Sequence, residues 1–213
     1  MGCTNCGVTK MRISSIKVQS EGYVHCKSNF YSAHDCMSNG SCHTFLPGIN
    51  TLMGEIDSGN WAISYLLSMY IHRPEDFVLF GQPQINVNNN LICLDELAPF
   101  SCYLDELDPL FSVHDSVAQL IKHGLQSSHS NDSCEDIRKL FHMDSERFER
   151  PLAGVGNEIF KAMAAIGYAN DKKVFCFPWL SKKRFESYHE NLTDLLRTLD
   201  DLGQISIVPV GMI

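Results

Sequence analysis

The sequence lacks several features that would assign it at once to a class of protein. No apolar run approaches the ~18–20 residues that a helix needs to span a bilayer. The first six residues, MGCTNC, do not form a basic segment followed by an apolar one, so no secretory signal is predicted. No internal repeat or low-complexity tract is present. We therefore expect a single soluble, cytosolic domain over residues 1–213.

Positive charge is also scarce. The chain carries 17 Lys and Arg against 25 Asp and Glu, which gives a net charge of −8. Binding to a phosphate backbone depends on clustered Lys and Arg, so this balance argues against a nucleic-acid partner. Hydrophobic residues make up 44% of the sequence, which is enough to build a sizeable core.

The nine cysteines are odd in number and accompany no export signal, so a disulfide framework is not expected. Five of them come early, interleaved with three histidines: Cys3, Cys6, Cys26, Cys36, Cys42, His25, His34 and His43. A structural zinc site usually needs two closely spaced pairs of ligands, and only the first two cysteines form such a pair. We predict no metal site, and a cysteine-based metal-binding protein or thiol enzyme stays as the alternative function.

One stretch organises the rest of the chain, and it reads Gly54-Glu55-Ile56-Asp57-Ser58-Gly59-Asn60-Trp61. It follows an apolar lead-in and opens a helical pattern. A strand, a turn bounded by glycines and a helix form the layout of a P-loop, in which backbone N–H groups hold phosphate. The glycines have the spacing of G-x-x-x-x-G-K-[ST], but Asn60 replaces the lysine and Trp61 the Mg²⁺-binding hydroxyl. Taken alone, the stretch also suits a plain strand-to-helix turn.

The remaining patterns predict an α/β fold. A small β layer precedes the turn, with strands at 11–18 and 23–26 and a turn at Gly22. Short strands follow it at 77–80, 85–87 and 91–94, separated by turn residues. A helical subdomain is predicted over about 112–150, with one helix from Cys134 to Phe148. After Pro151, strands alternate with helices, which favours a sheet covered by helices. The strands predicted there are 174–177 and 205–208, and the helices are 159–169 and a long one that ends at Gly203.

The order of these segments resembles a nucleotide-binding domain of the ATP-binding cassette (ABC) family of P-loop NTPases, over roughly residues 11–210. Leu152-Ala153-Gly154-Val155-Gly156 resembles the family signature in position, and Cys102-Tyr103-Leu104-Asp105-Glu106 resembles the glutamine loop, with Glu106 in place of glutamine. The resemblance implies a mixed sheet covered by helices and a site for ATP at 54–61 and Glu106. It also implies a membrane permease or a sister ABC ATPase as partner, and pairing as a dimer.

The departures from the family pattern affect the residues that perform the chemistry. Asn60 cannot neutralise phosphate charge, and Trp61 and Pro178 replace the two groups that hold Mg²⁺. Trp179 stands in place of the catalytic glutamate, and no switch histidine follows the last strand. We therefore predict no catalytic residue, no Mg²⁺, weak ATP binding at most and little or no hydrolysis.

Two roles follow from the resemblance. The first is a structural or regulatory ABC-like subunit, cytoplasmic and peripheral to the membrane through its partner. In that role, the acidic loop 105–108 and the helical segment 112–150 are the expected docking surface. The second is an ATP-binding subunit in which the backbone between Gly54 and Gly59 still holds phosphate despite the unusual side chains.

Overall fold

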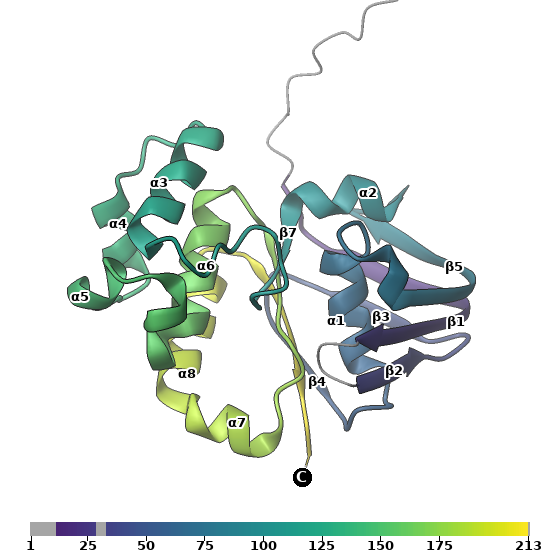
Figure 1. Ribbon diagram of the computed structural model, residues 1–213. Coiled ribbons are helices and arrows are strands. Elements are labelled where there is room, and N and C mark those ends of the chain that lie inside the picture. Colours follow the sequence, from purple (N-terminus) through teal and green to yellow (C-terminus); the bar gives the residue numbers. More distant parts are fainter. Residues whose placement is uncertain (1–11, 29–32, 213) are drawn as a thin grey trace, which may run out of the picture.

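The computed structural model describes residues 12–28 and 33–212. Within these ranges, two β-sheets enclose one helix, and further helices cover the outer face of the second sheet (Figure 1). The first sheet is antiparallel and contains β1 (Ile16–Ser28), β2 (Ala33–Met37), β3 (Cys42–Phe45), β5 (Phe77–Val87) and β6 (Asn90–Ile92). The second is parallel and has the order β4 (Gly48–Met53), β9 (Ile205–Val210), β8 (Val174–Cys176) and β7 (Ser101–Tyr103).

Helix α1 (Asn60–Met69) lies between the two sheets, and all ten of its residues are buried. Apolar residues occupy most of its circumference, which predicted a largely buried helix, and the structure confirms this. The hydroxyls within the helix find partners at short range, since buried polar groups need them. Ser64 Oγ donates to the carbonyl of Phe177 over 2.7 Å, and Ser68 Oγ donates to the carbonyl of Ser64 over 2.8 Å.

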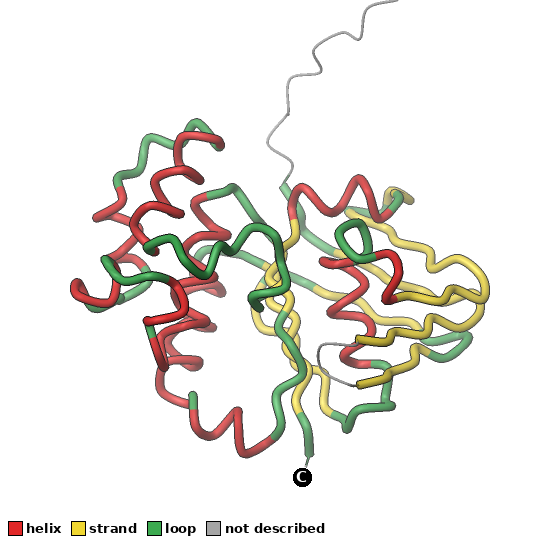
Figure 2. The backbone as a smooth tube through the Cα atoms, viewed as in Figure 1, coloured by secondary structure: helices red, strands yellow, loops and turns green. Residues whose placement is uncertain are grey.

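The parallel sheet has two buried faces, and its strands alternate between them. In the β8 segment, Val174 and Cys176 face α1, whereas Phe175 and Phe177 face the outer helices. The outer helices form the other half of the molecule (Figure 2). They are α3 (Val117–Ser127), α4 (Cys134–Leu140), α5 (Ser145–Phe148), α6 (Ile159–Ala169), α7 (Lys182–Ser187) and α8 (His189–Asp201). In the described ranges, no helix is long and apolar enough to cross a membrane.

Several predictions about individual elements were wrong. Gly22 is not a turn, because β1 runs without interruption from Ile16 to Ser28. The strands expected on either side of Gly81 are likewise one strand, β5. The helix expected from Cys134 to Phe148 is divided into α4 and α5, with His142 in the left-handed region at φ 48° between them. The short helix α2 (Leu94–Leu97) was not predicted, and the long helix predicted to stop at Gly203 is divided into α7 and α8.

Gly22 and Gly81 face each other across β1 and β5, and both have positive φ angles, 121° and 111°. A Cβ atom at Gly22 would lie 1.7 Å from the carbonyl oxygen of Phe80, and one at Gly81 would lie 1.9 Å from that of Glu21. The two strands therefore approach each other too closely for any side chain at this pair. Glycine in this strand marks a close backbone contact, not a chain reversal.

This contact predicts a large cost for a side chain at Gly22. We expect Gly22→Ala to lower the free energy of unfolding by about 3 kcal/mol, through backbone strain and the clash with Phe80. Gly40→Ala is the matched control, because Gly40 also has a positive φ, 77°, but no atom lies within 4 Å of the added Cβ. It should cost only about 1 kcal/mol. If chemical denaturation shows that both variants lose the same free energy of unfolding, the close contact between the strands does not contribute to the cost.

Candidate functional site: the turn before helix α1

The turn between β4 and α1 has the strand–turn–helix arrangement that the sequence predicted. Its backbone is tied to the end of β9, because the N–H of Gly54 donates to the carbonyl of Val210 over 2.9 Å. Ser58 Oγ closes the turn by donating to the carbonyl of Glu55 over 2.6 Å. Two residues take left-handed backbone angles, Asp57 at φ 90° and Gly59 at φ 84°. The N–H groups of Asp57 and Gly59 point toward the same side of the turn.

The side chains of Asn60 and Trp61, at the positions that match the lysine and hydroxyl of the P-loop pattern, point into the protein. A Cβ atom on Gly54 would lie 2.6 Å from Nδ2 of Asn60, so the Asn60 amide folds back over the start of the turn. Trp61 is 2% exposed, and its Nε1 donates to the hydroxyl of Tyr103 over 2.9 Å. Its ring also stacks on Tyr65 at 5.2 Å. Both residues are part of the buried interior.

A residue that the sequence analysis did not single out occupies the centre of the site. Asp35, on β2, is 2% exposed, and its carboxylate faces the N–H groups of the turn and of the first turn of α1. Oδ1 accepts hydrogen bonds from the N–H groups of Asp57 at 3.0 Å and Gly59 at 2.7 Å, and Oδ2 accepts one from Ala62 at 2.8 Å. The N–H of Cys36 adds a further bond to Oδ1 at 2.9 Å. A side chain of the protein thus fills the position of an anion at a helix N-terminus.

The segment after β8 also reaches the turn, as the order of the motifs predicted. Nε1 of Trp179 donates to the carbonyl of Gly54 over 3.2 Å. Pro178 beside it is buried and offers no side-chain oxygen to a cation. Across residues 12–28 and 33–212, no three His, Cys, Asp or Glu side chains are grouped closely enough to hold a metal ion.

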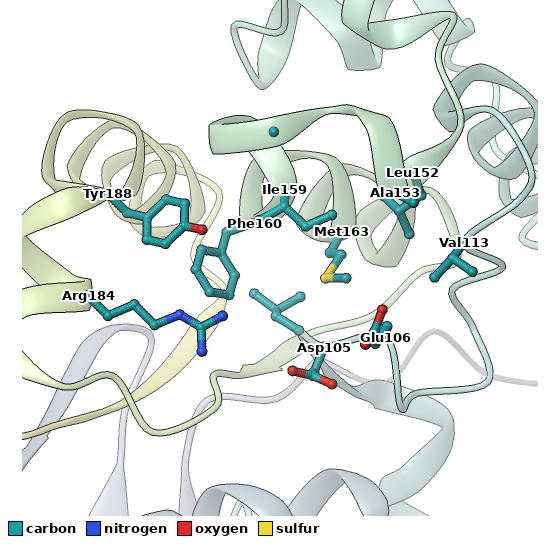
Figure 3. A pocket seen from close by; sticks show the side chains of 12 residues that line it. Asp105, Glu106, Val113, Leu152, Ala153, Ile159, Phe160, Met163, Arg184 and Tyr188 are labelled. Carbon is teal, nitrogen blue, oxygen red and sulfur yellow. The ribbon is translucent and has the colours of Figure 1, made fainter. Parts of the chain in front are cut away.

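Glu106, the proposed counterpart of the glutamine-loop residue, lies in a different place. It is exposed and lines an open pocket of about 450 Å³. Ala153 and Gly156 of the signature-like segment line the same pocket. Asp105 and Glu106 form part of one wall, and Arg184 extends toward them from α7 (Figure 3). The guanidinium of Arg184 lies 5.9 Å from the ring centre of Phe160. The structure therefore joins the glutamine-loop-like and signature-like segments in a pocket that none of residues 54–61 lines.

The cysteines within the described ranges are free thiols. Burial raises the pKa of Cys26, and the nearby charges of Asp35 and Asp76 raise it further. Burial raises the pKa of Cys176 to about 12. The pKa of Cys36 is also raised, by burial and then by Asp35. Because the thiolate is the nucleophile, these three positions do not suit a thiol enzyme. Cys3 and Cys6 lie outside the described residues.

Comparisons with known proteins identify the fold. No protein-family model and no curated protein matches the sequence. Among solved structures, a putative ABC transporter ATP-binding protein from Pyrococcus furiosus superposes with a TM-score of 0.57 at 13% identity, over 93% of this chain and 90% of that one. An ATP-binding cassette of an ABC transporter in its ADP conformation gives 0.58 at 11% identity, over 94% and 82%.

A bacterial Atm1-family ABC exporter with ATP bound gives a TM-score of 0.57 at 11% identity. The match covers 99% of this chain but only 36% of the exporter chain. The chain therefore has the mixed α/β fold of an ABC ATP-binding cassette, and that part of the sequence resemblance is confirmed. At such low identities the likeness establishes the fold alone.

The thiol environments predict a pattern of chemical labelling. With iodoacetamide near neutral pH, the exposed Cys42 and Cys93 should react. Cys26 and Cys176 should react at least ~100-fold more slowly until the protein unfolds, because burial keeps them protonated and inaccessible. Peptide mass spectrometry over time distinguishes the positions. A Cys26 that reacts first in the folded protein would instead favour the thiol-enzyme alternative.

Proposed function

We propose that this chain is a non-hydrolysing subunit with the ABC-cassette fold, which supports or regulates a complex with a membrane permease or an active sister ABC ATPase. One observation carries the proposal. The two residues at the positions of the P-loop lysine and hydroxyl, Asn60 and Trp61, are buried and serve the packing of the core. The turn from Gly54 to Trp61 contains no Lys or Arg and two acidic residues, Glu55 and Asp57.

The chemistry of phosphoryl transfer supports the loss of turnover. That reaction depends on a cation at the β- and γ-phosphates, a bound Mg²⁺ and a group that orients the attacking water. In this chain, Asn60, Trp61, Pro178 and Trp179 stand at those places, and none of them is charged. We infer that Mg²⁺ is not held and that ATP, which is bound in the Atm1-family exporter structure, binds weakly at most here.

A docking role draws support from the pocket around Glu106. It lies where the acidic loop 105–108 meets Val113 of the segment 112–150. Carboxylates on one wall and Arg184 on another give it both signs of charge around an apolar floor, a composition suited to a protein partner. We propose that the permease or sister ATPase docks there and brings this cytoplasmic chain to the membrane. We also propose that the chain pairs as a dimer.

The first test is enzymatic. The purified protein should hydrolyse ATP far below ~1 s⁻¹, the low end of the usual range of turnover numbers, with or without Mg²⁺. The physical reason is the absence of charge stabilisation and of a water-orienting base. A turnover of ~1 s⁻¹ that disappears in the Asn60→Ala variant would overturn the proposal.

The second test concerns the partner. A photoreactive amino acid at position 106 should form adducts in cells with a multi-span membrane protein or with an ABC ATPase, and mass spectrometry separates these two outcomes. Position 17, exposed on β1 in the other half of the molecule, is the matched control and should form none of these adducts. The same adducts from both positions, or none from position 106, would contradict docking at this pocket.

A further inference from the structure

We propose that Asp35 is a built-in substitute for a bound phosphate, which closes the turn before α1 and keeps phosphoanions out. This inference rests on the proposed function, because it takes the turn before α1 to be related to a phosphate-binding loop. It assigns to one side chain of β2 the control of a turn whose counterpart in a P-loop holds phosphate.

The first support is the way the carboxylate uses the available donors. Its two oxygens accept hydrogen bonds from the N–H groups of Asp57, Gly59 and Ala62. Asp57 and Gly59 belong to the loop before α1, and Ala62 belongs to the first helical turn. Unpaired N–H groups and the positive end of the helix dipole attract an anion to this place. With the carboxylate in position, these donors are already engaged, and a phosphate must displace it to bind.

The second support is steric. A Cβ atom on Gly59 would lie 2.8 Å from the carbonyl oxygen of Cys36 and 3.1 Å from the Cα of Met37. The backbone of β2 therefore lies directly against the turn, and only glycine permits this approach. The anion position is covered by a strand as well as filled by a side chain. A phosphate gains entry only if β2, an edge strand that pairs only with β1 among the described strands, moves away.

The third support is electrostatic. The turn contributes the carboxylates of Glu55 and Asp57 and no basic side chain, and Asp35 adds a further negative charge. In a P-loop the lysine offsets the phosphate charge, but Asn60 carries none. An arriving phosphate is repelled by these groups while it competes for donors that are already paired.

The test uses Asp35→Ala in the full chain, with pyrophosphate as the probe. We expect the variant to bind pyrophosphate at least tenfold more tightly than the wild type in calorimetry, and its thermal unfolding midpoint to rise with added pyrophosphate. The matched control is Asp76→Ala. Asp76 is equally buried, at 3% exposure, but its carboxylate accepts hydrogen bonds from the side chains of Tyr65 and Arg73 instead of from backbone N–H groups. The Asp76→Ala variant should lose stability without gaining affinity for pyrophosphate.

Two results would overturn the inference: wild type that binds pyrophosphate as tightly as Asp35→Ala, or a folded Asp35→Ala variant with no gain over Asp76→Ala. Amide hydrogen exchange on the wild type keeps the inference testable if the variant fails to fold. The N–H groups of Asp57, Gly59 and Ala62 should exchange slowly, and pyrophosphate should leave their rates unchanged. Fast exchange at these groups would refute the closed turn. Failure of the proposed function is a separate result, since it appears as ATP turnover by the wild type.

Discussion

The burial of α1 on every side imposes the constraint on which the rest of the structure depends. A helix leaves its first N–H groups without partners in the helix, and water normally satisfies them. Between two sheets water is excluded, and an unpaired buried N–H costs free energy comparable to a lost hydrogen bond. The carboxylate of Asp35 meets this requirement with charge-assisted bonds to Gly59 and Ala62. The same contact ties the antiparallel sheet to the central helix.

On its other side, α1 is held to the parallel sheet by polar contacts at several levels. Trp61 Nε1 donates to Tyr103 near the start of the helix, Ser64 to the carbonyl of Phe177 farther along, and Ser101 Oγ to the carbonyl of Leu67 near its end. Each hydrogen bond fixes the position of α1 along the strands, because apolar packing alone does not specify that position. The turn before α1 is thereby part of a buried, hydrogen-bonded interior.

The sequence predicted the elements whose patterns are strong and local. Helix α1, a strand predicted at 174–177 and a long helix predicted to stop at Gly203 follow from apolar periodicity and from a helix stop. The structure contains them as α1, β8 (Val174–Cys176) and α8 (His189–Asp201). Gly22 was misread because a glycine that permits close strand contact has the same local signal as a turn. Asp35 was missed because its partners lie 22 to 27 residues away and belong to another element. Only the packing of β2 against α1 reveals the pairing.

The contact between Asp35 and the turn also constrains how the sequence can change over generations. Losing the carboxylate alone leaves buried N–H groups unpaired, and losing Trp61 alone leaves a cavity that costs several kcal/mol. Neither substitution by itself introduces a cation or a metal ligand. A change toward a turn that could hold phosphate therefore passes through less stable proteins. Selection for stability alone is enough to keep the turn in its present state.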